Sequence, residues 1–459
     1  MTARLARLWA SIALLGLSSC ATAPRPVTTP MPPAPGPSRI EAPAETSAAG
    51  QAVERARPGS AAPEARGPMI TVGLAWDLDS LSLDPAGEAR LVGAAPGTLS
   101  AAEWLHVSVN PQGAVARVRG GAESWQVSLW ASDTLWISGT EGDEDDPTRL
   151  IRWDGKSWRG QFKVFINPRG KLTLAARIPL EKYLLGVLPG EIGPLAEDLL
   201  EAGRAQAVAA RSYTLFYRGR RGPEGFDVYA TVEDQVYGPV EAEKPLATRC
   251  VESTTGKVAL HDGAPIRANY FSTCGGITAD VWEAWPTPPL PYLVSHRDRG
   301  FSGDHCRTSP HHRWHEEWPA AEFLANLQRF APTYGVRLPS GGLGDLLEVK
   351  VVLRSRSGRA WVLEVVTTRG EIAIPAYSLR QVLRRPGRSE AILRSNLIKV
   401  GVRRDRRTGR ALEVVVEGAG SGHGVGLCQT GALGMARAGS KGEEIIRHYF
   451  PNVQIHELY

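Results

Sequence analysis

PLEKYLLGVLPGEIGPLAEDLLEAGRAQAVAARSYTLFYR, residues 179–218, is the stretch that decides the fold. Residues 180–188 are apolar apart from one Glu-Lys pair, and they predict a buried strand that ends at a Pro-Gly turn. Apolar and small residues then recur at helical spacing from Leu195, which predicts a helix of about five turns. Glu191 lies between these two buried elements, where a carboxylate is unusual, and it is therefore the first candidate functional residue.

The N-terminus carries the features of an export signal. Arg4 and Arg7 precede a short apolar run at 8–17, and Leu-Ser-Ser-Cys closes the segment at Cys20. This ending resembles a bacterial lipobox, which predicts that residues 1–20 are a lipoprotein signal peptide and that Cys20 carries the lipid. A plain signal peptide with a chance cysteine is the alternative. The lipid anchors the exported protein to the periplasmic face of the outer membrane or to the cell membrane facing the wall. Ala21, in place of a retention aspartate, favours the outer membrane.

Residues 21–67 are rich in Pro, Ala, Thr and Ser and cannot bury enough apolar surface to fold. They predict a disordered tether with a contour on the order of 100 Å, long enough for an anchored domain to reach a distant target. The formal net charge of the whole chain is only +5. Its basic residues form no stripe with interleaved aromatics, which excludes a typical nucleic-acid partner.

The rest of the chain predicts an α+β fold of mainly antiparallel sheets with a few helices, in two lobes around a cleft. Short alternating segments separated by Gly, Pro, Asn and Asp make residues 68–177 a β-rich scaffold. Residues 178–459 form the functional core. We expect a further α+β lobe to be inserted in this core at about residues 314–400, with a helix that begins near Pro319.

Several motifs in this core resemble the SpoIID/LytB family of bacterial cell-wall proteins, in the family's order. They include Glu191, the AQAVAARSY run at 205–213 and the Asp-Gln-Val-Tyr motif at 234–237. The YFSTCGG loop at 270–276 and the GHGVGLCQ motif at 422–429 complete the pattern. Smaller matches lie at 183–187, 291–293 and 449–451.

The resemblance implies a lytic transglycosylase that cleaves the MurNAc–GlcNAc bond of peptidoglycan to 1,6-anhydro ends, on strands poor in stem peptides. Glu191 matches the family's catalytic glutamate. One carboxyl group can suffice, because the attacking hydroxyl belongs to the substrate and the same group can serve first as acid and then as base. We expect burial to raise the pKa of Glu191, against the helix N-terminus that we expect just beyond it. The alternative is a non-catalytic peptidoglycan-binding protein or an enhancer of a cell-wall amidase, which also makes an amidase a possible partner.

Other matched polar residues are candidates for binding the glycan. They lie on the helix after Glu191 or on loops that could converge on Glu191. Each could instead have a structural role, in which its buried polar group forms hydrogen bonds with the backbone. His423 could contact sugar or orient Glu191. The candidates are Gln206, Arg211, Gln235, Ser272, Gly275, Gly276, Thr278, His423 and Gln429.

Neither a metal nor another cofactor is expected. Some sporulation members of the family bind zinc through a Cys and a His near the Asp-Gln-x-Tyr motif, but residues 229–234 contain neither. An exported protein favours disulfides over thiols, so the His-Cys cluster at 305–315 is a weak zinc candidate. We prefer a disulfide between Cys274 and Cys306, while the pairing of Cys250 and Cys428 stays open.

Overall fold

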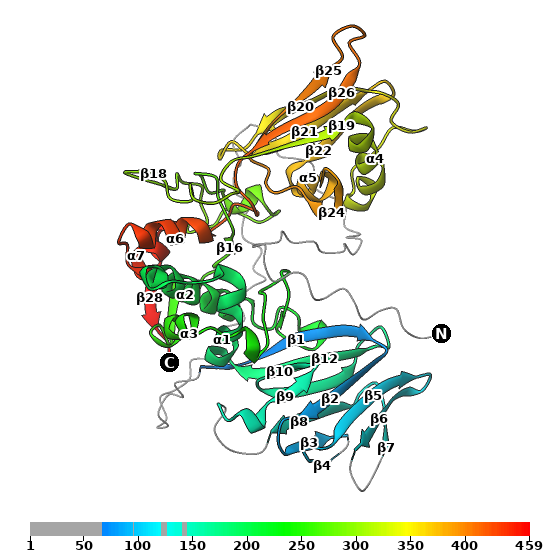
Figure 1. Cartoon of the computed structure of the whole chain (residues 1–459), viewed down its shortest axis with the longest axis vertical. Helices are drawn as coiled ribbons and strands as arrows, with labels where there is room; N and C mark the ends of the chain where they lie inside the picture. Colours follow the sequence, from blue (N-terminus) through cyan, green and yellow to red (C-terminus); the bar gives the residue numbers. More distant parts are fainter. Residues whose placement is uncertain (1–66, 95, 121–125, 140–144) are drawn as a thin grey trace.

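A computed structural model describes residues 67–94, 96–120, 126–139 and 145–459. The predicted signal peptide, Cys20 and almost the whole predicted tether lie outside the described residues. Within the described ranges, no helix is both long and apolar enough to cross a bilayer. Figure 1 shows the chain with its longest axis vertical, with β-sheets at the bottom, a group of helices in the middle and an α+β region at the top.

The described part of the N-terminal region forms two mainly antiparallel sheets. Buried and partly exposed residues alternate along strands such as β6, as expected for a sheet with one buried face. The seven-stranded sheet has the order β13 (Val228–Tyr229), β1 (Met69–Leu78), β12 (Leu172–Pro179), β11 (Gln161–Ile166), β8 (Thr134–Gly139), β3 (Ala89–Gly93), β4 (Gly97–Leu99). The six-stranded sheet has the order β10 (Lys156–Trp158), β9 (Ile151–Trp153), β2 (Ser80–Pro85), β5 (Trp104–Asn110), β6 (Gly113–Arg119), β7 (Gln126–Leu129).

The predicted strand at 180–188 is wrong. This segment belongs to helix α1 (Leu180–Ile192), which follows β12 directly and contains Pro189. Nine of its 13 residues are buried, on all sides of the helix. An all-round buried helix shows no polar face, so its short apolar run cannot be distinguished from a buried strand by pattern. Gly193, with φ of 77°, ends the helix in a conformation that favours glycine.

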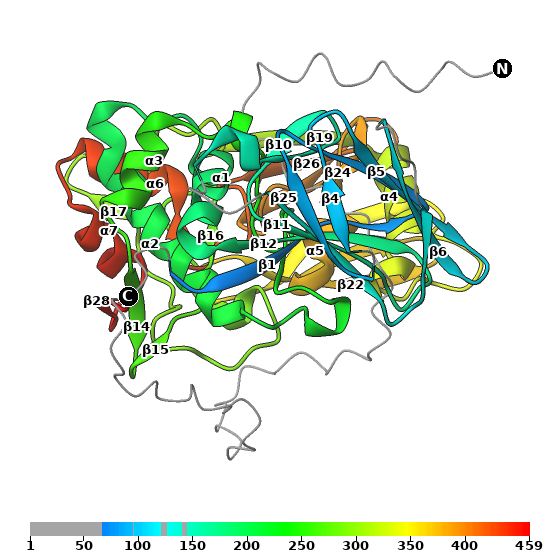
Figure 2. The same cartoon turned by 90° about the horizontal axis from the view of Figure 1, so that it is seen from below.

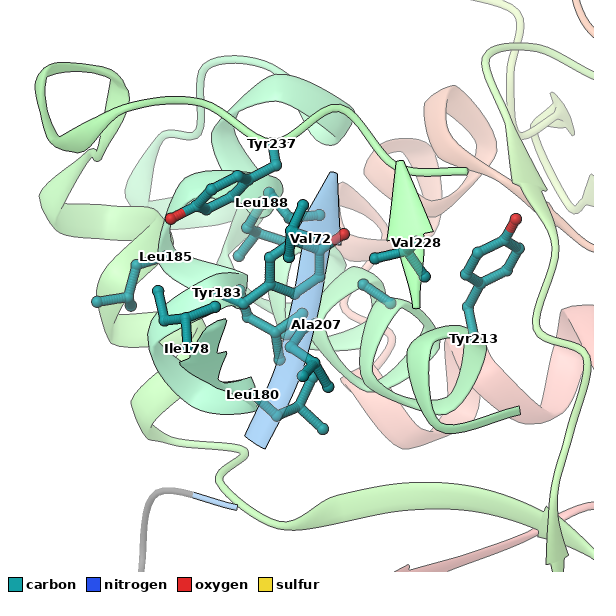
Figure 3. Packing of buried hydrophobic residues seen from close by; sticks show 14 of the residues in the cluster. Val72, Ile178, Leu180, Tyr183, Leu185, Leu188, Ala207, Tyr213, Val228 and Tyr237 are labelled. Carbon is teal, nitrogen blue, oxygen red and sulfur yellow. The ribbon is translucent and has the colours of Figure 1, made fainter. Parts of the chain in front are cut away.

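The predicted helix from Leu195 is confirmed as α2 (Leu200–Tyr217), preceded by a short 3-10 turn at Glu197–Leu199. It contacts α1, α3 (Pro245–Glu252), α6 (Gln429–Arg437) and α7 (Gly442–Tyr449), and these helices lie together in both views (Figures 1 and 2). One hydrophobic core joins these helices to the N-terminal sheets. In Figure 3, Val72 of β1, Tyr183 of α1 and Ala207 of α2 belong to the same packed group.

A second hydrophobic core lies in the α+β region at the top of Figure 1 and draws its buried residues from Trp318 to Val416. It contains the sheets β20 (Leu346–Arg354), β21 (Ala360–Thr367), β22 (Gly370–Pro375) and β19 (Trp314–Pro319), β26 (Ala411–Gly418), β25 (Ile398–Arg404). Helices α4 (Ala320–Phe330) and α5 (Ala376–Val382) pack against them. The helix that we expected near Pro319 is confirmed.

The remaining strands are short. The parallel pair β16 (Tyr270–Phe271) and β27 (Leu427–Cys428) joins the YFSTCGG loop to the GHGVGLCQ motif. The others are β14 (Lys257–His261), β15 (Ala264–Pro265), β17 (Arg299–Gly300), β18 (Gly303–Asp304), β23 (Arg384–Arg385), β24 (Arg388–Ile392) and β28 (Gln454–Glu457). In the described part, only β1–β13 and β16–β27 pair in parallel, so the mainly antiparallel α+β class is confirmed.

Candidate functional site

Glu191 occupies the last turn of α1 and is half-buried. The backbone N–H of Val236 donates a hydrogen bond of 2.7 Å to Glu191 Oε1. The Nε2 atom of Gln429 donates to the other carboxylate oxygen, Oε2, over 3.5 Å. Segments from the middle and the end of the chain therefore hold both oxygens of this one carboxyl group.

Burial raises the pKa of Glu191 from its ordinary value of 4.5 to about 7, although the hydrogen bonds from Val236 and Gln429 both act to lower it. Among the described residues, no second carboxylate contributes to this shift. The expected opposition from a helix N-terminus is wrong, because Glu191 lies at the C-terminal end of α1. The negative end of that helix dipole disfavours a carboxylate and so acts in the same direction as burial.

Glycines in α1 let the Asp-Gln-Val-Tyr loop approach Glu191. A Cβ atom on Gly186 would lie 2.5 Å from the carbonyl oxygen of Gly238, and one on Gly190 would lie 3.1 Å from Val236 Cγ1. The N–H of Gly238 donates to the carbonyl of Gly186 over 3.1 Å. Close backbone approach at these glycines therefore brings the N–H of Val236 to the carboxylate.

Gln429 reaches Glu191 because its segment is anchored on the YFSTCGG loop. Strand β27 ends just before Gln429 and pairs with β16. The carbonyl of Ser272 accepts hydrogen bonds from the N–H and the hydroxyl of Thr430, at 3.0 and 2.9 Å. Ser272 thus supports the start of α6 through its backbone. Of the nine binding candidates, Gln429 is the one with a described hydrogen bond to Glu191.

Arg211 and Gln235 are fully buried and their polar atoms have protein partners. Arg211 makes a two-pronged ion pair with Glu181, at 2.7 Å for both bonds, and donates to the carbonyl of Lys257. Gln235 accepts from Thr214 and Tyr183, and donates to Tyr270 and to a backbone carbonyl. Both side chains therefore have the structural role that the sequence left open, and Gln235 also orders the loop that carries Val236.

Four more candidates are buried or have a conformation set by the backbone. Gln206 is 0% exposed, and neither of its amide atoms has a hydrogen-bond partner among the described residues. The hydroxyl of Thr278 bonds to the segment 294–296. Gly275 and Gly276 have φ angles of 74° and 98° and line a surface hollow. The other residues around this hollow include Arg297, Arg299, Asp304, Arg307, His312 and Arg313.

His423 uses both ring nitrogens on the backbone. Nδ1 lies 3.1 Å from the N–H of Val425, which donates to it, and Nε2 lies 3.0 Å from the carbonyl of Tyr270. Burial lowers the pKa of His423 to about 3, so the ring is neutral. It packs against the rings of Phe271 and Trp285. In this arrangement His423 holds the Gly-rich turn against β16, and it makes no described hydrogen bond to Glu191.

Sequence reasoning missed three groups near Glu191. The N–H of Val236 is one, and no side-chain pattern can reveal a backbone donor. Tyr183 and Tyr270 are the others: burial raises the pKa of both phenols well above their ordinary value, and the negative charge of Glu191 adds to this. Both tyrosines belong to matched motifs and both bond to Gln235, so their motif membership was the available signal.

The predicted disulfide between Cys274 and Cys306 is not formed in the structure. Their Sγ atoms are 3.4 Å apart, whereas a disulfide bond is about 2.05 Å long. The four cysteines in the described ranges are free thiols. Cys274 and Cys306 are neighbours, as expected, but a third thiol and a carboxylate meet them at the same point, because β16 and β27 run side by side.

Two segments of the chain match protein families, and several known proteins are similar in sequence. Residues 168–261 match the stage II sporulation protein family, SpoIID, and residues 293–426 match a domain of unknown function (DUF8618). Stage II sporulation protein D of Bacillus subtilis is 28% identical over 296 residues, which are 61% of this chain and 75% of that protein. The amidase enhancer of Bacillus subtilis is 27% identical over 311 residues, covering 59% of this chain and 40% of the relative. An uncharacterized protein of Brachyspira hyodysenteriae is 27% identical over 293 residues, which are 64% of this chain and 70% of that protein. The resemblance seen in the sequence is confirmed: the segment that carries Glu191 matches the model of the stage II sporulation protein family.

Proposed function

We propose that the protein is a peptidoglycan lytic transglycosylase in which Glu191 alone acts as acid and base. The observation that carries this proposal is the half-buried carboxyl group of Glu191, which accepts hydrogen bonds from Val236 and Gln429 and whose pKa is raised by burial to about 7. Such a group is protonated often enough near neutral pH to act as an acid, and its conjugate base is a competent base. The similarity to sporulation protein D and to an amidase enhancer supports a role at the cell wall.

In the proposed reaction, protonated Glu191 gives its proton to the oxygen that links MurNAc C1 to GlcNAc C4, and the C1–O bond breaks. The N–H of Val236 and the amide of Gln429 stabilise the carboxylate that is left, because both donate to its oxygens. The carboxylate then takes the proton of the MurNAc 6-hydroxyl as O6 bonds to C1. Glu191 is protonated again at the end, and no water is consumed.

The first prediction concerns the pH profile. Cleavage should decline as the pH rises through about 7, since the acid form of Glu191 is then lost. Gln429→Leu removes a donor that lowers this pKa. The alkaline limb of the rate profile should therefore move to higher pH, by less than about one unit for one long hydrogen bond. Gln454→Leu, which changes an exposed glutamine of β28, is the control and should leave the limb in place. A limb that moves to lower pH in the Gln429 variant contradicts this role.

The test of the function is to incubate the purified protein with peptide-free glycan strands and with intact peptidoglycan, and to follow new chain ends by mass spectrometry. We expect 1,6-anhydro ends, with faster release from peptide-free strands. The similarity to an amidase enhancer supports a second candidate, a non-catalytic protein that stimulates a cell-wall amidase. That candidate predicts no new glycan ends but faster release of stem peptides when an amidase is added.

We further propose that Cys20 carries a lipid that anchors the protein in the outer membrane, since Leu-Ser-Ser-Cys follows a short apolar run. The 47 residues from 21 to 67, a segment rich in proline, would then separate the folded part from the lipid. Cys20→Ser should move the protein from the membrane fraction to the soluble fraction. Equal sedimentation of both forms with the membranes would contradict the anchor.

A further inference from the structure

Three thiols and a carboxylate meet in the interior below the YFSTCGG loop. Cys274, Cys306, Cys428 and Asp298 are each 0% exposed, and their ligand atoms all lie within 4.8 Å of one another. The Sγ atom of Cys274 lies 3.4 Å from that of Cys306 and 2.9 Å from Asp298 Oδ2. These residues come from four separate places in the chain, so the fold gathers them.

Backbone N–H groups are directed at two sulfur atoms of this cluster. The N–H groups of Cys274 and Gly431 both point at Cys428 Sγ, at 3.1 and 3.3 Å. The N–H of Gly276 lies 3.3 Å from Cys274 Sγ. Backbone donors on sulfur stabilise a thiolate more than a thiol, and they are the usual outer partners of metal-bound cysteines.

Hydrogen bonds fix the orientation of the Asp298 carboxylate beside the thiols. Its Oδ1 atom accepts from the hydroxyl of Tyr449 at 2.8 Å and lies 3.2 Å from His448 Nε2. This leaves Oδ2 directed at the thiols. The buried guanidinium of Arg359 donates to the carbonyl of Cys274 over 3.4 Å and brings positive charge to the same loop. A carboxylate fixed by outer hydrogen bonds is typical of a metal ligand.

We propose that Cys274, Cys306, Cys428 and Asp298 bind one Zn²⁺ ion. Thiolate sulfur selects zinc over magnesium or calcium, and four ligands with no open position are typical of a structural site. With Zn–S bonds of about 2.3 Å, neighbouring sulfurs in a tetrahedron lie about 3.8 Å apart, so small adjustments suffice. Binding releases the three thiol protons to solvent and changes no oxidation state. This site differs from the zinc site that some family members have near the Asp-Gln-x-Tyr motif. In this chain, residues 229–234 contain neither the Cys nor the His that would bind zinc there.

The ion would fasten the YFSTCGG loop and the segment around Cys306 to the start of α6. Cys428 directly precedes Gln429, whose amide donates to Glu191. The zinc would thus hold that amide in place. The metal site itself does not depend on the proposed function, because it is defined by metal content and spectra and not by glycan cleavage.

The test starts from the full-length protein, reduced and freed of metal, to which CoCl₂ is added. We expect thiolate-to-cobalt charge-transfer absorption that saturates at about one equivalent and is displaced by ZnCl₂. Cys306→Ser should lose this absorption. Cys250→Ser should keep it, since Cys250 is a buried thiol that bonds to the carbonyl of Leu200 and is no member of the cluster. Zinc should also raise the unfolding temperature of the wild type and of Cys250→Ser.

Absence of cobalt absorption in the reduced wild type overturns the site, whether or not the variants fold. So does a Cys274–Cys306 disulfide that forms in air in the presence of equimolar ZnCl₂, detected by mass spectrometry of peptides. If the protein binds zinc but its metal-free form cleaves glycan at the same rate as the zinc-bound form, the metal site stands. Only its proposed effect on Gln429 is then removed.

Discussion

Glu191→Gln is expected to abolish the formation of anhydro ends and, at the same time, to stabilise the fold above pH 7. The amide has the shape of the protonated acid and can still accept from Val236, but it can neither give nor take a proton. Loss of a positioned acid and base costs about 10²–10⁴-fold in rate. Because one group serves both steps here, we expect the loss to lie at the upper end of that range.

The gain in stability follows from the raised pKa. The carboxyl has a pKa of about 7 in the fold and 4.5 as its ordinary value, so the folded state binds the proton more tightly than the unfolded state. The cost of the buried charge is therefore absent below pH 4.5, grows between these two values and is complete above pH 7. A shift of this size corresponds to about 3 kcal/mol, and partial solvent access reduces the expected gain to about 1–3 kcal/mol.

Urea unfolding at pH 5 and pH 8 measures this effect. Glu191→Gln should gain little over the wild type at pH 5 and the full amount at pH 8. Glu197→Gln is the matched control, because Glu197 is an exposed carboxylate close by in sequence, in an exposed ion pair with Arg249. It should keep activity and show no gain. An equal gain for Glu191→Gln at both pH values would mean that burial of its charge is not the cause.

Arg211→Met is expected to cause the largest loss of stability, about 3–5 kcal/mol. The variant leaves the carboxylate of Glu181 buried without the two guanidinium bonds of 2.7 Å that it accepts in the fold. An uncompensated buried charge is the expensive case, whereas exposed ion pairs contribute about 0–1 kcal/mol. Since domains are stable by about 5–15 kcal/mol, this loss is a large share of the total.

The measurement is urea unfolding at pH 7 with two companion variants. Arg249→Met removes an arginine from the exposed pair with Glu197 and should cost less than about 1 kcal/mol. Arg211→Met combined with Glu181→Met removes both buried charges and should recover much of the loss. If Arg211 instead bound glycan, the single variant would keep its stability and show a raised KM.

The sequence predicted those parts of the fold and of the candidate site that leave a local pattern of residues. Glu191 was singled out because a carboxylate among apolar and turn residues is unusual in any local pattern. Helix α2 was found because small and apolar residues recur at helical spacing over a run too long for a strand. Strands such as β21 were found because buried and less buried residues alternate along them. Helix α1 was taken for a strand because it is buried on all sides and so has no helical periodicity to detect.

The environment of the carboxylate required the fold. The direction of the helix dipole at Glu191 was predicted with the wrong sign, since it depended on whether the preceding segment was a strand or a helix. Motif residues such as Arg211 and Gln235 belong to the pattern but serve the scaffold, and a motif does not separate these roles. The sequence predicted that Cys274 lies beside Cys306, but the position of Cys428 next to them depends on the pairing of β16 with β27, which sequence spacing does not reveal.

The most direct test of the central claim is to run the cleavage of peptide-free glycan strands in water enriched in heavy oxygen. If Glu191 gives its proton to the glycosidic oxygen and then takes one from the MurNAc 6-hydroxyl, no water takes part. The new MurNAc ends are then anhydro, lighter than hydrolysed ends by one water, and free of heavy oxygen. Glu191→Gln should give no such ends. Heavy oxygen in the new ends, or equal product from wild type and Glu191→Gln, would contradict a one-carboxyl lytic mechanism.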